Sequence, residues 1–257
     1  LFNLKAPAIL KKNPVNILVA GCGTGRHALH VARYFRDAKV LAIDISAKSL
    51  QYAQKMAAHY DIHNVEFLQA DILELNQIQQ EFDIIECSGV LHHMQDPLAG
   101  ARILSSLLAP NGIMKIGLYS ERARESVVVC RDLIESENIP CSAAGIRQLR
   151  GKIIEQSDEE AWKNILISPD FYNLSGCRDL LFHVQEHRFT PHQIAKLVND
   201  IDMSFLGFSN LNSKTVGNYR KQFASDIAMT DLDNWQQYEL QHSDTFAAMY
   251  QFYVQKT

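Results

Sequence analysis

The stretch Val15-Asn-Ile-Leu-Val-Ala-Gly-Cys-Gly-Thr-Gly25 decides the fold of this chain. Its first six residues form a short apolar run that stops at a glycine, which is typical of a buried parallel strand. From Thr24 to Phe35 the apolar side chains recur at helical spacing. Glycines between a strand and a helix let the backbone approach a ligand, and the helix start offers unpaired N–H groups. We therefore predict that the loop 21–25 binds an anionic group.

Outward from this loop, strands and helices alternate up to residue 118. Helical periodicity predicts helices that begin after Ser46, a favourable N-cap, and near Pro97. The turn residues Pro110-Asn111-Gly112 follow the second of these helices. The alternation predicts an α/β, doubly wound fold with a mostly parallel sheet and right-handed crossovers. The strands expected in this part are 15–20, 39–43, 64–69, 82–87 and 113–118.

The alternation is interrupted twice after residue 118. We expect a mostly helical insertion over residues 119–190 and a second, more polar insertion over residues 212–246. Between them, Thr190-Pro191 begins a helix to about Asp202, with proline at a favourable first position. Because the chain shows no repeat and no low-complexity linker, we expect a single domain over residues 1–257. The last two strands are expected at 203–208 and 249–254.

Composition excludes several classes of protein. Of the 257 residues 47% are hydrophobic, which is enough for a full core, and the net charge of −4 argues against a nucleic-acid partner. No apolar run approaches the ~20 residues that span a bilayer. Five cysteines without a C-x-x-C pair predict free thiols in a reducing compartment, and hence a cytoplasmic protein. The chain begins at Leu1 rather than methionine, so we expect further residues upstream.

Polar residues follow three successive predicted strands. Asp44 comes 23 positions after Gly21, where an acid can accept hydrogen bonds from both hydroxyls of a ribose. Asp71 can reach an exocyclic amine of adenine, and Ser88-Gly89 ends the next strand. Ligands of open α/β sheets bind at this carboxyl edge, where the strand order reverses. Each acid could instead cap a helix or face solvent, but three in successive register favour a nucleoside site.

The spacing of the glycines separates two kinds of cofactor. A nicotinamide or flavin enzyme would show Gly-x-Gly-x-x-Gly at this point. Here the third glycine is Gly25, one residue early, and Arg26-His27-Ala28 follows. A dinucleotide oxidoreductase is therefore disfavoured, although a glycine turn that only links strand to helix remains an alternative for the loop taken alone.

Five motifs in order resemble the class I S-adenosylmethionine-dependent methyltransferases. They cover residues 15–118 and read Ile-Leu-Val-Ala-Gly-Cys-Gly-Thr-Gly, Ala-Ile-Asp-Ile-Ser, Gln-Ala-Asp-Ile, Ser-Gly-Val-Leu-His-His-Met and Leu-Ala-Pro-Asn-Gly. The resemblance implies seven strands in the order 3-2-1-4-5-7-6, with the last strand antiparallel. It implies S-adenosylmethionine as cofactor and S-adenosylhomocysteine as product. The cofactor-binding residues it implies are Gly21, Cys22, Gly23, Thr24, Gly25, Asp44, Ile45, Asp71, Ile72, Ser88 and Gly89.

The resemblance also bears on the acceptor. The segment from Cys177 to Thr190 and the aromatic tail resemble bacterial methyltransferase domains fused to tetratricopeptide arrays. This resemblance implies a protein or cell-surface acceptor, and a small molecule stays open. Members of the family usually carry an N-terminal helix over the cofactor. About 14 residues precede the first predicted strand, so we expect the lid to lie upstream or to come from an insertion.

Histidines after the fourth strand are the candidates for chemistry. A methyl group on a sulfonium is already activated, so a general base is needed only for an acceptor that is protonated at working pH. We expect His93 and Tyr119 to be the catalytic residues and His92 to face the acceptor. A histidine that only packs or caps a helix start is the competing interpretation.

One further motif points to different chemistry. His183-Val-Gln-Glu-His187 matches H-x-x-E-H, and on a helix its two histidines would share one face, as zinc requires. Thr190-Pro191 would end such a helix at once, and the surrounding pattern predicts a nucleotide-type sheet. We therefore expect no metal, and we assign His183 and His187 to the acceptor site.

The sequence thus predicts a methyltransferase, with a catalytically idle cofactor-binding module of the same fold as the alternative. A nucleic-acid methyltransferase is disfavoured by the charge and by Ser88-Gly-Val-Leu in place of an Asn-Pro-Pro-Tyr type motif. The two insertions are expected to form the acceptor site. The identity of the acceptor and the oligomeric state stay open.

Overall fold

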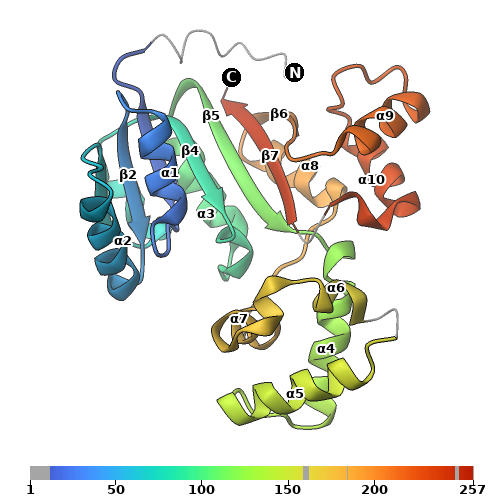
Figure 1. Ribbon diagram of the computed structural model, residues 1–257. Helices are drawn as coiled ribbons and strands as arrows, with labels where there is room; N and C mark the ends of the chain where they lie inside the picture. The colour runs from blue at the N-terminus through green and yellow to red at the C-terminus, as the bar shows by residue number, and fades with distance from the viewer. Residues whose placement is uncertain (1–11, 159–161, 184, 247–248, 257) are drawn as a thin grey trace.

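The fold is seen in a computed structural model that describes residues 12–158, 162–183, 185–246 and 249–256. Within this part the strands form a seven-stranded sheet in the order β3-β2-β1-β4-β5-β7-β6 (Figure 1). The first five strands pair in parallel, and β7 runs antiparallel to both of its neighbours, as predicted. The strands are β1 (Asn16–Ala20), β2 (Lys39–Asp44), β3 (Val65–Gln69), β4 (Phe82–Ser88), β5 (Leu108–Tyr119), β6 (Met203–Phe208) and β7 (Met249–Lys256).

Both faces of β1 are buried, which explains its unbroken apolar sequence. Successive side chains of a strand point to opposite faces. Ile17 and Val19 pack in one hydrophobic cluster with the apolar face of α1 (Arg26–Tyr34). Leu18 and Ala20 belong to a second cluster, which includes side chains of α3 (Pro97–Ser106) and α8 (Pro191–Asp200). The helices therefore cover the sheet on both sides, as a doubly wound fold requires.

Local capping sets where the helices begin. Ser46 accepts a hydrogen bond from the Ser49 amide at the start of α2 (Ala47–His59), as its sequence position predicts. At α8, Thr190 and Gln193 form a reciprocal capping box, and Pro191 occupies the first turn. The predicted turn at 110–112 is wrong in one respect, because these residues lie within the bounds of β5. Asn111 has a φ of 62° there, and the pairing with β4 changes register between Phe82 and Ile84.

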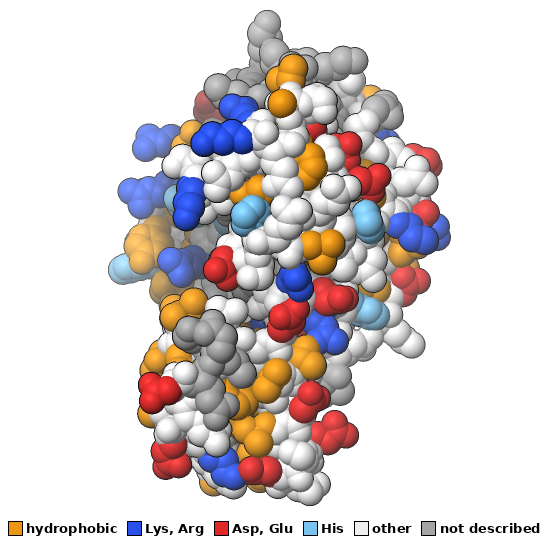
Figure 2. Space-filling model, turned by 90° about the vertical axis from the view of Figure 1, so that its right-hand side faces the viewer, with side chains coloured by type: hydrophobic (Ala, Val, Ile, Leu, Met, Phe, Trp, Pro, Cys, Tyr) orange, Lys and Arg blue, Asp and Glu red, His pale blue; other side chains and the backbone are white. Residues whose placement is uncertain are grey.

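The first insertion is a helical lobe with a hydrophobic cluster of its own. It comprises α4 (Glu125–Ser136), α5 (Ala143–Glu155), α6 (Lys163–Leu166) and α7 (Leu174–Phe182). Figure 1 shows this lobe beyond the carboxyl ends of β4 and β5. In Figure 2 hydrophobic side chains gather over the lower part, with acidic and basic side chains around them. The lobe buries Val127, Cys130, Ile139, Ile146, Leu149, Ile153, Trp162, Ile165, Phe171, Cys177 and Leu181.

The second insertion packs on the main core instead. It contains α9 (Ser213–Gln222) and α10 (Leu232–Gln241), and Tyr219 and Trp235 join the cluster under β6 and β7. Glu239 of α10 is 2% exposed. Its carboxylate accepts hydrogen bonds from Ser120 Oγ at 3.0 Å and Tyr250 Oη at 2.6 Å, so it joins α10 to the end of β5 and to β7.

The residues before β1 bear on the expected lid. Residues 1–11 lie outside the part that the structure describes. In the described ranges, no helix combines the length and the apolar character needed to cross a membrane.

We predict that Glu239→Ala lowers the free energy of unfolding by about 3 kcal/mol, because it leaves two buried hydroxyls without their acceptor. The measurement is urea denaturation followed by circular dichroism. Glu125→Ala removes a carboxylate that is 67% exposed and is expected to change the value by less than about 0.5 kcal/mol. Equal effects of the two variants would refute the assigned role of Glu239.

Candidate active site

The glycine-rich loop between β1 and α1 has the backbone conformation that its sequence predicts. Gly21, Gly23 and Gly25 have φ values of 73°, 54° and 81°. A Cβ on Gly21 would lie 2.2 Å from a Val90 methyl, so this position needs glycine for packing. At Gly23 an added Cβ would meet no atom within 4 Å. The loop thus packs against Val90 at Gly21, and its backbone is open to a ligand at Gly23.

Cys22 and Thr24 belong to the same loop. Thr24 is exposed and Cys22 half-buried. Burial, and then the nearby charge of Asp44, raise the pKa of the Cys22 thiol to about 12. The thiol therefore stays protonated at neutral pH and is a poor nucleophile.

Asp44 joins the end of β2 to the glycine loop. Its Oδ2 accepts a hydrogen bond from the Gly23 amide at 2.7 Å, and its Oδ1 accepts one from the Ser46 amide at 2.9 Å. A carboxylate has about four acceptor positions, so capacity remains for further donors such as ribose hydroxyls. Ile45 follows and is 70% exposed. An uncovered aliphatic side chain next to an oriented carboxylate fits a nucleoside.

The remaining predicted cofactor residues end β3 and β4. Asp71 accepts a hydrogen bond from the Leu73 amide at 2.9 Å, so it does cap the 3-10 helix η2 (Ile72–Gln77). The Ile72 side chain is buried. Ser88 is exposed at the end of β4, and Gly89 has a φ of 80°. The Ala70 amide donates to the Asp44 carbonyl at 3.2 Å, which places the β3 end beside Asp44.

Tyr119, at the end of β5, is held between two groups. The His92 ring stacks on it at 3.7 Å between centroids, and the Arg124 guanidinium carbon lies 3.9 Å from its centroid. At these separations the two groups must occupy opposite faces of the ring. Burial raises the pKa of Tyr119, and the Arg124 charge opposes this only in part. The phenol therefore keeps its proton and can donate a hydrogen bond.

His92 is a fully buried histidine of η3 (Leu91–His93). Neither ring nitrogen makes a hydrogen bond of good geometry among the described residues, although the Gly117 backbone lies close enough to oppose the lowering of the His92 pKa. Burial, followed by the nearby charges of His93 and Arg124, lowers the pKa of His92 from 6.5 to about 3. His92 is therefore neutral at physiological pH, and its role toward the acceptor stays a prediction.

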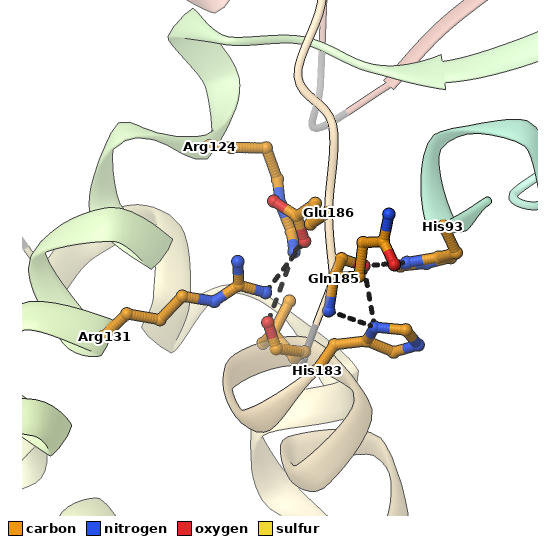
Figure 3. A network of polar contacts seen from close by, with 7 residues as sticks. His93, Arg124, Arg131, His183, Gln185 and Glu186 are labelled. Atoms are coloured by element: carbon orange, nitrogen blue, oxygen red, sulfur yellow. Dashed lines mark hydrogen bonds and ion pairs between the residues drawn. The ribbon is translucent and has the colours of Figure 1, made fainter. Parts of the chain in front are cut away.

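His93 is held in one tautomer. Its Nδ1 lies 3.0 Å from the backbone carbonyl oxygen of Gln185, and because a carbonyl only accepts, Nδ1 carries the proton (Figure 3). Nε2 therefore keeps its lone pair. Burial lowers the pKa of His93, against the opposing effect of that carbonyl. The ring also stacks on His183 at 3.9 Å, so the two histidines do come together.

The segment 185–187, which we call the strap, crosses the loop after β4. The His187 amide donates to the His92 carbonyl at 2.7 Å, and Gln185 Nε2 donates to the Met94 carbonyl at 3.2 Å. The helix that a zinc-binding H-x-x-E-H would need is not formed, because α7 ends at Phe182. Val184 of that motif lies outside the described residues. The strap thus returns from the lobe to the sheet as extended chain.

Residues that the sequence did not single out complete this network. Arg124 and Arg131 both pair with Glu186 of the strap, the latter at 2.9 Å. No local pattern could have indicated them, since Arg124 and Glu186 are 62 positions apart.

A cavity of about 480 Å³ adjoins His183 on the lobe. Most of its lining comes from α7, and His183, which also lines the cavity, stacks on the His93 ring at 3.9 Å. This places the cavity beside the candidate catalytic residues. Its lining residues are Cys141, Ser175, Gly176, Arg178, Asp179, Phe182 and His183.

A family model described as a methyltransferase domain matches residues 11–167, which is more than half of the chain. The chain belongs to this methyltransferase family. The predicted family is thereby confirmed.

Two bacterial proteins illustrate the similarity in sequence. This chain is 30% identical over 245 residues to the uncharacterised protein syc1184_c of Synechococcus sp. The matched residues are 87% of this chain and 56% of the relative. This chain is also 34% identical over 97 residues to a ubiquinone biosynthesis O-methyltransferase of Acinetobacter baylyi, over 37% of this chain and 40% of the relative. The chain thus spans about half the length of the curated relatives it matches.

Solved structures share the fold of this domain. PKMT2 from Rickettsia typhi is 19% identical, with a TM-score of 0.73 over 99% of this chain and 50% of that one. Magnesium protoporphyrin IX methyltransferase (ChlM) from Synechocystis is 14% identical, with a TM-score of 0.51 over 97% of this chain and 74% of that one. The likeness to PKMT2 therefore includes the helical lobe.

We predict that His92 makes the domain less stable in mild acid. Between pH 6.5 and 5 the unfolded chain binds a proton at an ordinary histidine that folded His92, with its pKa near 3, cannot bind. The free energy of unfolding should therefore fall by about 2 kcal/mol at pH 5. Urea denaturation at both pH values measures this.

The control is His92→Phe, which keeps a flat ring against Tyr119 but cannot titrate. The variant is expected to lose about 2 kcal/mol less than the wild type between pH 6.5 and 5. If wild type and variant lose the same amount, another group causes the acid sensitivity.

Proposed function

We propose that this domain transfers a methyl group from S-adenosylmethionine to an acceptor bound between the carboxyl edge of the sheet and the helical lobe. The observation that carries the proposal is the Asp44 carboxylate, bonded to the Gly23 amide at 2.7 Å, next to the exposed Ile45. Two structural neighbours support the choice of cofactor. PKMT2 has been solved with AdoHcy and ChlM with bound SAM.

Each end of the cofactor has a matching group in this chain. The loop 21–25 and the start of α1 would hold the methionine carboxylate through backbone N–H groups. Asp44 would accept hydrogen bonds from the ribose hydroxyls, and Ile45 would cover one face of the adenine. Asp71 and the Ile72 amide would bind the adenine edge, while Ser88 and Gly89 would border the site at β4. The cofactor supplies the activated methyl group.

The protein's main task is to orient the acceptor and to exclude water. The acceptor atom forms its bond to the methyl carbon while the bond from that carbon to sulfur breaks. Where the acceptor carries a proton, Nε2 of His93 receives it, since this nitrogen keeps its lone pair and the ring is neutral at pH 7. Tyr119 donates a hydrogen bond to the acceptor. His183 borders the cavity through which the acceptor enters.

We predict that Asp44→Ala weakens S-adenosylmethionine binding more than tenfold, because the ribose hydroxyls lose their charged acceptor. Isothermal titration with S-adenosylmethionine, S-adenosylhomocysteine and NAD measures this, and NAD is expected not to bind. Asp37→Ala, which changes an exposed acid in the turn after α1, is the matched control. Equal affinities of both variants and the wild type would reject the assignment of Asp44, and no binding by the wild type would reject the function.

We predict that His93→Ala leaves S-adenosylmethionine affinity within about twofold but slows methyl transfer by about 10²-fold, the usual contribution of a general base. The assay follows radiolabel from methyl-labelled S-adenosylmethionine into a bacterial lysate. Unchanged transfer would make His93 a packing residue. Binding without transfer by the wild type would favour the idle cofactor-binding module.

A further inference from the structure

Three segments meet at the carboxylate of Glu186 (Figure 3). Glu186 lies in the strap, and its side chain is 1% exposed. Arg124, from the 3-10 helix η4 (Arg122–Arg124) at the entry to the lobe, is 2% exposed and binds both carboxylate oxygens. Arg131 of α4 adds a bond at 2.9 Å and is 26% exposed. A bidentate arginine–carboxylate pair of this kind is geometrically specific.

The same arginine reaches the active site. Its guanidinium lies over the face of Tyr119 opposite His92, at 3.9 Å from the ring centroid. Arg124 also donates to the Leu180 carbonyl of α7 at 3.3 Å. One side chain therefore contacts a candidate catalytic ring, the strap and a helix of the lobe. Lysine could not replace it, because only a planar guanidinium stacks and binds bidentately at once.

The neighbours of Glu186 in the strap hold the histidines. On one side, the Gln185 carbonyl accepts the Nδ1 proton of His93 at 3.0 Å. On the other, the His187 amide bonds the His92 carbonyl at 2.7 Å. The position of the strap thus decides which nitrogen of His93 carries the proton. Without a carbonyl at that place, the neutral ring could adopt either tautomer.

We propose that Arg124 and Glu186 are a positioning pair, which anchors the strap and thereby keeps His93 in the tautomer with a free Nε2 and Tyr119 in its ring orientation. The functional meaning of the pair rests on the proposed role of His93. Its structural content, a tautomer set by an ion pair on another segment, can be tested without an acceptor.

The test is ¹⁵N NMR of the full chain labelled on its histidine rings. The His93 signals are identified by their loss in His93→Asn. In the wild type we expect the proton on Nδ1, and in Glu186→Gln we expect it shared between Nδ1 and Nε2. Glu125→Gln is the matched control, because it makes the same change at an exposed site of α4, and it should keep the wild-type pattern.

Glu186→Gln leaves the buried Arg124 without a carboxylate and could unfold the domain, so a second variant is needed. Arg124→Met combined with Glu186→Leu replaces the ion pair by apolar side chains of similar size, which other proteins often tolerate. It should fold, as judged by circular dichroism, and show the same mixed tautomers. A wild-type tautomer in either folded variant overturns the proposal, and loss of folding in both assigns the pair to stability alone.

Titration with S-adenosylmethionine separates this proposal from the proposed function. Both variants are expected to bind the cofactor within about twofold of the wild type, because the pair lies outside the glycine loop and Asp44. If the wild type does not bind S-adenosylmethionine, the function fails while the tautomer result still decides the role of the pair.

Discussion

The parallel strands β1 to β5 all end at the same edge of the sheet, and the rest of the molecule is arranged around that edge. Each crossover returns the chain to the opposite edge, so residues that follow separate strands come together without contact in sequence. The glycine loop, Asp44, Asp71, Ser88 and Tyr119 reach the edge in this way. The hydrogen bond from the Gly23 amide to Asp44 joins two of these strand ends directly. The first insertion leaves the sheet at the same place, which sets its helices over the site (Figure 1).

Burial determines the chemistry of the rings at this edge. His92 and His93 lie where the charged form of an imidazole is disfavoured, and burial lowers the pKa of both. In a neutral histidine one ring nitrogen carries the proton and the other accepts. For His93 the Gln185 carbonyl of the strap fixes the proton on Nδ1. Near these rings, Arg124 and Arg131 form ion pairs with the same carboxylate, that of Glu186. Because both arginines belong to the lobe and the carboxylate to the returning strap, these ion pairs join the two ends of the insertion.

The helical lobe also occurs in a solved structure of the same fold. The likeness to PKMT2 extends over 99% of this chain, so the helical lobe and the second insertion are shared with that fold. The family model, in contrast, stops at residue 167, before the strap. The matched residues include the glycine loop and the ends of β2, β3 and β4 at the cofactor edge. The strap and most of the cavity lining along α7 lie after the matched residues.

The resemblance to the methyltransferase family implied the strand order and the cofactor-binding residues. The sequence by itself determined where the strands, the helix starts and the acids after the strands lie. These features have local causes: apolar runs mark buried strands, glycine permits positive φ, Ser46 and Thr190 cap helices, and an acid after a strand stands at the carboxyl edge. Only the tertiary structure decided that His92 is fully buried, that His183 and His187 do not share a helix, and that Glu186 pairs with Arg124. Those outcomes depend on contacts between residues far apart in the chain, and no local pattern records such contacts. The tautomer of His93 belongs to the same class, because its hydrogen-bond partner lies 92 positions away.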